Sequence, residues 1–149
     1  MHIQRIFVLA GVTTLLAAGA LAQSDSDYQM WMKTNIATAQ ALPKDIAAKD
    51  GKAVSADGQK LDGILKQVED FWQKRNVPDA VNFAKQAQLA AEAISKAGDA
   101  GNLDQATAEI KNLQANCMGC HMAHRERTPE GNFKIKYAPL ARPPWPPII

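Results

Sequence analysis

The sequence is poor in the residues from which disulfides and metal sites are usually built. Its 149 residues include only two cysteines and three histidines, and the cysteines stand three positions apart. Disulfides that join distant segments are therefore excluded. A structural zinc site is disfavoured, because it usually takes four ligands from two separated pairs. After residue 22, no apolar run reaches the roughly 20 residues that a membrane-spanning helix needs.

A strong excess of one charge is also lacking. The chain has 17 lysines and arginines against 15 aspartates and glutamates, which gives a formal net charge of +2. Nucleic-acid-binding domains usually carry a strongly basic surface, so nucleic acid is not an expected partner. The length suits a single domain.

The first 22 residues have the pattern of a secretory signal peptide. Arg5 precedes an apolar run over residues 6–22, which ends in the sequence Ala-Leu-Ala, an A-x-A-like cleavage site. Cleavage would make Gln23 the first mature residue and leave 16 basic against 15 acidic residues. A retained N-terminal anchor is the alternative, but small and polar residues interrupt the run and favour cleavage. We therefore expect a periplasmic protein.

Residues 117–121 read Cys-Met-Gly-Cys-His, the C-x-x-C-H signature of covalent haem attachment. Both thiols would form thioethers with the porphyrin, and the adjacent imidazole would bind the iron. In a helix, Cys117, Cys120 and His121 share one face, because they stand at i, i+3 and i+4. The expected cofactor is one covalent haem c with its iron.

Three other interpretations of this motif are weaker. A redox dithiol usually follows a strand at a helix N-terminus, whereas here a helical pattern runs through the motif. A zinc site would have to use Cys117, Cys120, His121 and His124, which are too close in sequence for a good tetrahedron. A plain disulfide between the two cysteines is the third.

Apolar residues at steps of three and four predict two helices in the first half of the mature chain. The first spans about residues 26–42, with N-cap residues before it and Pro43 as its end. Residues 43–55 are predicted as a loop, and the second helix follows over about 55–75. The apolar stripe of the first helix consists of Tyr28, Trp31, Met32, Ile36, Ala39 and Leu42.

Two more helices are predicted in the second half. The third runs over 78–97, with Pro78 in its first turn and Gly98 as its C-cap. Asn102 caps the fourth, whose stripe continues into the haem motif. The fold class is therefore all-α, an antiparallel up-down-up-down four-helix bundle with the haem in the core near the C-terminal helix. The stripe of the fourth helix is Leu103, Ala106, Ile110, Leu113, Cys117, Cys120 and His124.

The character of the chain changes from residue 128 onward. Six of its eight prolines lie in residues 128–149, which favours an irregular or polyproline II tail. Phe133, Ile135 and Tyr137 alternate with polar residues and predict an extended segment laid against the bundle. We therefore divide the chain into a signal peptide (1–22), a bundle domain (23–127) and a Pro-rich tail (128–149).

The chain resembles the class II cytochromes c, the cytochrome c′ family and its low-spin relatives. As in that family, four helices precede the tail and C-x-x-C-H stands near the end of the last one. The resemblance covers about residues 26–126. It extends to the His-x-x-aromatic-Arg pattern over residues 121–125, where His124 replaces the usual tyrosine or phenylalanine.

A second ligand of the haem iron would have to come from a residue that precedes the motif in the sequence. The methionine and the histidine that follow His121 lie within one helical turn of it, and so on the same side of the haem ring as His121. The resemblance implies that the first helix covers the distal face, with a methionine ligand in low-spin members. The run Gln-Met-Trp-Met-Lys over residues 29–33 looks like that version, with Met32 as ligand and Met30 facing away. Core packing of Met32, or a five-coordinate iron, is the alternative.

These residues favour a one-electron carrier that serves redox partner proteins and is not an enzyme. A rival is a five-coordinate protein that binds NO or CO, and a second rival is a haem subunit that docks a partner through its Pro-rich tail. The resemblance implies that Arg125 contacts a haem propionate or the pocket, whereas the alternative is a solvated charge at the helix end. Homodimers are common in the family, but the sequence does not decide the oligomeric state.

Overall fold

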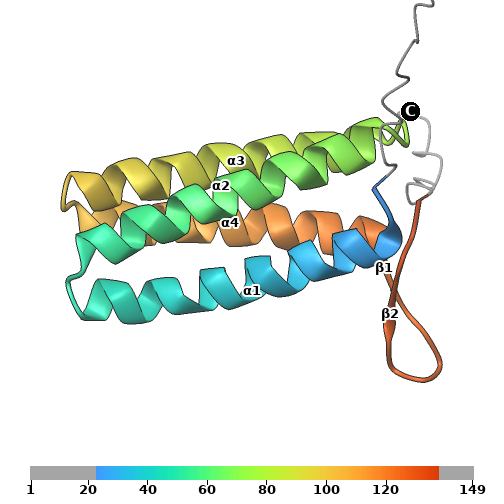
Figure 1. Ribbon diagram of the computed structural model, residues 1–149, viewed down its shortest axis with the longest axis horizontal. Helices are drawn as coiled ribbons and strands as arrows, with labels where there is room; N and C mark the ends of the chain where they lie inside the picture. The colour runs from blue at the N-terminus through green and yellow to red at the C-terminus, as the bar shows by residue number, and fades with distance from the viewer. Residues whose placement is uncertain (1–22, 138–149) are drawn as a thin grey trace, which may run out of the picture.

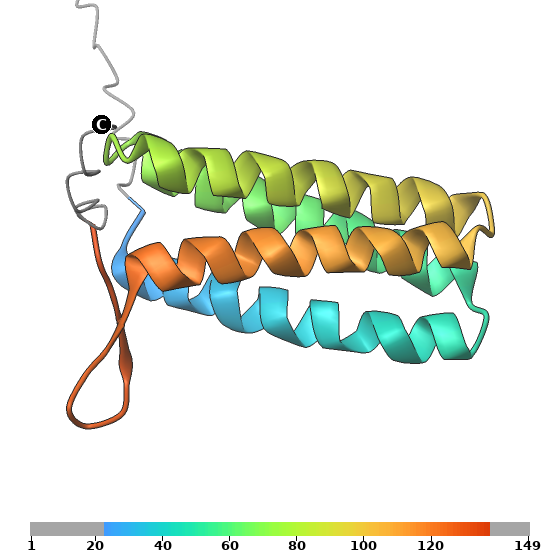
Figure 2. The same cartoon turned by 180° about the vertical axis from the view of Figure 1, so that it is seen from behind.

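The protein folds into a bundle of four long helices, which the computed structural model describes over residues 23–137. The helices are α1 (Asp25–Ala47), α2 (Gly51–Gln73), α3 (Pro78–Asp99) and α4 (Leu103–His124). Successive helices run in opposite directions and are joined by short turns at alternating ends (Figures 1 and 2). The predicted four-helix bundle is confirmed. The predicted signal peptide and residues 138–149 of the predicted tail lie outside the described residues.

Three helix starts were predicted from capping chemistry and are confirmed. Ser24 and Asp27 form a capping box at the start of α1, in which each side chain bonds the other residue's backbone N–H. Pro78 occupies the first turn of α3. The Asn102 side chain accepts a hydrogen bond from the Gln105 N–H at 3.1 Å and caps α4.

The prediction that Pro43 ends the first helix is wrong, and so is the predicted loop over residues 43–55. Pro43 lies inside α1, which continues to Ala47. The reason is packing, because Leu42 is fully buried and Ile46 lies against the same core one turn later. This burial outweighs the cost of the proline. After a short turn, Asp50 caps α2 by accepting from the Ala53 N–H at 3.0 Å.

Helices α2 and α3 approach each other closely at glycines. A Cβ atom at Gly98 would lie 2.5 Å from the backbone nitrogen of Ser55, and one at Gly58 would lie 2.6 Å from that of Ser95. The hydroxyls of Ser55 and Ser95 form a buried hydrogen bond of 3.1 Å across the same contact. The prediction of Gly98 as a C-cap is therefore wrong, since Gly98 belongs to the packed interface and Gly101 takes the positive φ of +67° in the turn.

The core is built from the predicted stripes of α2 and α3. Small alanines on α3 face large apolar side chains on α2, which is how the two helices come close. Six large apolar side chains of α2, spaced three and four residues apart or adjacent, are buried: Leu61, Ile64, Leu65, Val68, Phe71 and Trp72.

A short hairpin follows α4. Strand β1 (Arg125–Arg127) pairs antiparallel with β2 (Phe133–Ile135), so the hairpin crosses the predicted boundary between bundle and tail. Ile135 packs against the core, and the Tyr137 ring stacks on Phe71 with 6.4 Å between centroids. The predicted extended segment against the bundle is confirmed for Ile135 and Tyr137, whereas Phe133 is 49% exposed and lies beside the arginines of β1. Within residues 23–137, no helix is both long and apolar enough to cross a membrane.

Candidate functional site

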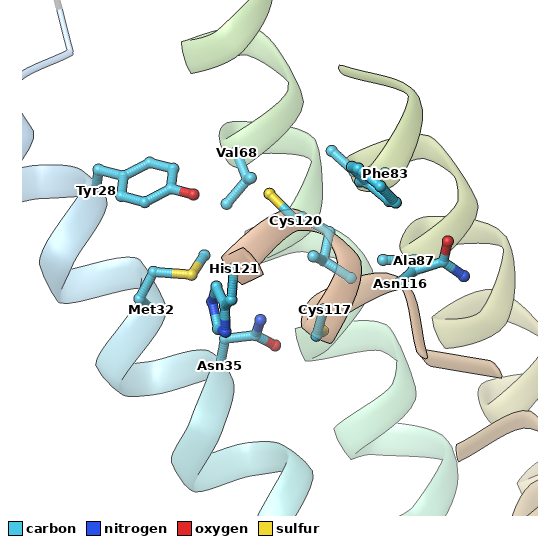
Figure 3. Close-up of a pocket in the computed structure, with 12 residues that line it drawn as sticks. Tyr28, Met32, Asn35, Val68, Phe83, Ala87, Asn116, Cys117, Cys120 and His121 are labelled. Atoms are coloured by element: carbon cyan, nitrogen blue, oxygen red, sulfur yellow. The ribbon is translucent and has the colours of Figure 1, made fainter. Parts of the chain in front are cut away.

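The motif Cys117–His121 lies in the last turns of α4 and faces the neighbouring helix α1 (Figure 3). Cys120 is 8% exposed, while Cys117 and His121 are half-buried. As the spacing predicted, the three side chains lie on one side of the helix, so one planar molecule beside α4 could touch all of them.

Three cavities meet around this motif, and His121 lines all of them. The largest, a groove of about 440 Å³ between α1 and α4, is within the usual range for ligand pockets. A smaller cavity reaches inward to α2 and α3 and is lined by both motif cysteines. The third opens toward the hairpin. We refer to the three together as the α1–α4 crevice.

Helix α1 presents Met32 to the crevice. Met32 lines two of the cavities, and its thioether points toward the His121 ring (Figure 3). Met30 points outward and is 57% exposed, as its position on the helix predicted. The structure therefore brings the predicted ligand candidate Met32 opposite His121 and leaves Met30 outside.

Burial lowers the pKa of His121, and the positive charge of Arg125 lowers it further. The imidazole is therefore neutral at neutral pH, and a neutral ring nitrogen is what a metal requires. Arg125 itself is exposed, lines the cavity nearest the hairpin, and lies 4.2 Å over the Phe133 ring. It stands at the mouth of the crevice, close enough to His121 to influence its charge.

The two thiols differ from a redox dithiol in their pKa values and in their burial. Burial raises the pKa of Cys117, and it raises the pKa of Cys120 to about 12. Reactive dithiols have lowered thiol pKa values and partly exposed sulfurs. The cysteines are unpaired in the structure, so neither the redox nor the disulfide alternative is supported by their surroundings.

We expect Cys120 of the haem-free chain to react with iodoacetamide at pH 8 about a thousandfold more slowly than in the unfolded chain. The reactive species is the thiolate, and raising the pKa from 9.0 to about 12 reduces its population by that factor. Alkylation followed by mass spectrometry of the peptide measures the rate, with the urea-unfolded chain as control. Equal rates in the two states would contradict the buried geometry.

His124 is placed differently from a simple member of the apolar stripe. It is 3% exposed and packs on Trp72, with 4.9 Å between ring centroids. Its Nδ1 lies 3.0 Å from the Lys136 carbonyl oxygen and its Nε2 lies 3.0 Å from Asp79 Oδ2, so both nitrogens face acceptors. Both ring nitrogens therefore have a polar partner within hydrogen-bond distance. A tyrosine or phenylalanine would not tie α3 and the hairpin together in this way.

Sequence reasoning missed several residues that line the crevice. The stripe prediction placed Ile36 in the core; Ile36 lines the groove between α1 and α4 but is 46% exposed, and the neighbouring Asn35 is buried. The helix is therefore rotated slightly from the expected face. On α3, Phe83 lies over the motif, because a Cβ at Gly119 would come within 2.5 Å of its ring. A polar residue three positions after Met32 was the available signal for Asn35.

Comparisons with protein-family models, with curated proteins and with solved structures find no match for this chain. Across residues 23–137, no three His, Cys, Asp or Glu side chains are grouped so that they could hold a metal ion. The zinc alternative therefore has no ligand set in that part of the chain.

Proposed function

We propose that the chain is a periplasmic monohaem c-type cytochrome of the class II kind that carries one electron between redox partner proteins. The observation that supports this most directly is the convergence of two thiols, a neutral imidazole and a thioether on one apolar crevice. Each of these groups is one that haem c uses, and their order along α4 is that of the attachment signature.

The residues of the crevice suit this cofactor. Cys117 and Cys120 would hold it covalently, and His121 would bind its iron from the side of α4. Met32 would approach from α1 on the opposite side. A further sign is the Asn35 Oδ1 atom, which is buried in the crevice without a hydrogen-bond partner, as expected where a bound group completes the surroundings. The haem, when bound, supplies a one-electron iron couple, and a methionine ligand raises its potential.

Apolar side chains and a buried phenol surround the inner part of the site. Tyr28 lines the crevice, its hydroxyl accepts a hydrogen bond of 3.2 Å from Trp72 Nε1, and burial raises its pKa strongly. It therefore stays a neutral phenol rather than a base. The close contact between α2 and α3 at their glycines sets the distance between these two helices. These features favour a carrier over an enzyme.

The decisive experiment is expression of the full chain in a bacterium that matures c-type cytochromes. We expect a coloured periplasmic protein whose mass equals residues 23–149 plus one haem, and which is reduced and reoxidised reversibly by one electron. Cys117→Ser with Cys120→Ser is the control and should leave the haem unattached. A colourless wild-type protein, or a mass without haem, would refute the proposal.

A further inference from the structure

The segment after α4 carries an excess of positive charge that the helices do not share. Residues 125–137, which contain the β1–β2 hairpin, hold four basic and two acidic residues, a formal net charge of +2. Residues 23–124 hold 11 basic and 13 acidic residues, a formal net charge of −2. The hairpin projects from the end of the bundle (Figures 1 and 2), so positive charge is concentrated at that end.

Two arginines of β1 present this charge beside an aromatic ring. Neither Arg125 nor Arg127 forms an ion pair within the described residues. Lys134, by contrast, is paired with Glu126 at 3.5 Å. The guanidinium carbons of the two arginines lie 4.2 and 5.7 Å from the centre of the Phe133 ring. Because a cation is attracted to the face of an aromatic ring, the two guanidiniums and the ring form one surface, which we call the hairpin surface.

The hairpin surface lies at the mouth of the α1–α4 crevice. Arg125 and Phe133 line the cavity nearest the hairpin, and His121 lines the same cavity. Ile135 packs against the core and holds the hairpin in this place. Phe133 is 49% exposed, and both arginines are exposed. Aromatic residues and arginines are enriched where proteins bind each other, so this composition favours a protein partner.

We propose that the hairpin surface docks an acidic patch of the redox partner protein at the mouth of the crevice. This inference rests on the proposed function and adds the kind of partner. The two unpaired guanidiniums attract carboxylates of the partner during the encounter and fix its orientation. The ring of Phe133 supplies apolar area that the partner covers. Docking at this place brings the partner beside the residues that would hold the haem.

An anionic membrane surface is the other partner that unpaired arginines could attract. Segments that bind anionic lipids usually carry clusters of about four to eight lysines and arginines. The hairpin segment has four, and Glu126 and Glu130 lie among them. An acidic protein patch needs only a few matched charges and an apolar contact, so the observations favour it over a membrane.

The test measures how fast reduced flavodoxin, an acidic one-electron donor, reduces the haem-loaded protein. Arg127 is the residue to change, because it lies opposite Phe133 in the hairpin and does not line the cavity beside His121. At low ionic strength we expect the rate to fall about threefold in Arg127→Gln and about tenfold in Arg127→Glu, because charges at an interface rim act mainly on association. The wild-type rate should fall as salt is added, and this dependence should be weaker in both variants.

Lys52→Glu is the matched control. Lys52 is exposed and lies at the start of α2, at the opposite end of the bundle from the hairpin (Figure 1). The variant therefore makes the same change in net charge far from the hairpin surface, and it should slow the reaction less than about twofold. Reduction by the semiquinone of lumiflavin, a small neutral donor, should be equal in the wild type and all variants, because it depends on the haem and not on docking.

Four outcomes would overturn the inference. Arg127→Glu could match the wild type with flavodoxin, or Lys52→Glu could be slowed as much, which would leave net charge as the only cause. A parallel loss of rate with lumiflavin in both Arg127 variants would show a structural effect on the site. Wild-type binding to phosphatidylglycerol vesicles that Arg127→Glu abolishes, with an unchanged flavodoxin rate, would identify a membrane partner instead. A colourless wild type would refute the proposed function as well, and that result is distinguishable because it is seen before any variant is made.

Discussion

Replacing Gly58 by alanine is expected to lower the free energy of unfolding by about 2 to 3 kcal/mol. The added Cβ would lie 2.6 Å from the Ser95 nitrogen and 2.9 Å from the Ala91 carbonyl oxygen. Both are backbone atoms of α3, so no side chain can turn away to make room. Helices α2 and α3 would have to separate, which also stretches the buried hydroxyl bond between Ser55 and Ser95.

Gly63 provides a matched control in the same helix. It also lies inside α2, but nothing lies within 4 Å of the Cβ that an alanine would add. Gly63→Ala should therefore raise the free energy of unfolding by about 0.5 to 1 kcal/mol, the usual gain in helix propensity. Urea unfolding followed by circular dichroism measures both variants. Equal effects at the two glycines would show that the helices are not in contact at Gly58.

The second large effect is expected for Met32→Ala in the haem-loaded protein. If Met32 is the distal ligand, the variant should lose the methionine–iron charge-transfer band and its ferrous form should bind carbon monoxide readily, because one coordination position becomes open. The reduction potential should fall, since a methionine ligand raises it. Absorption spectra of the oxidised and reduced protein, with and without carbon monoxide, measure the change.

Met30→Ala is the control for this variant. Met30 is two residues away and 57% exposed, so its removal should leave the spectra unchanged. Two results would count against Met32 as ligand. One is a Met32→Ala variant with the spectrum of the wild type. The other is a wild type that already binds carbon monoxide as readily as the variant, which would favour the gas-binding rival.

The sequence predicts the helices well where a regular apolar stripe is reinforced by caps. In α2 and α3 the stripe is long and its partner helix is the next one along the chain, so pattern and packing agree. Pro43 shows where this reasoning fails. Proline usually ends a helix, but here the burial of Leu42 and Ile46 stabilises the helix on both sides of it. The prediction that Gly98 ends the third helix failed for a similar reason, because a glycine can allow two helices to approach closely as well as end a helix.

The site was predictable to the extent that its chemistry is carried by one short motif. Cys117, Cys120 and His121 could be named as candidates from their spacing, whereas Met32 was named from the resemblance to the class II cytochromes c and lies on the helix face that it shares with Tyr28. Asn35 left only a weak signal, its polar side chain three positions after Met32, and the contacts of His124 left none, because they depend on the return of the hairpin beside α3. Tertiary arrangements of this kind leave no periodic signal in a single sequence.

The glycine contact between α2 and α3 also bears on the order of assembly. These helices are consecutive and joined by a short turn, and contacts between sequence neighbours form early because little chain has to be closed into a loop. Helices α1 and α4, by contrast, are the farthest apart along the chain. Their meeting is therefore expected late in folding, and Cys117 and His121, which line the groove between the two helices, should stay accessible until then.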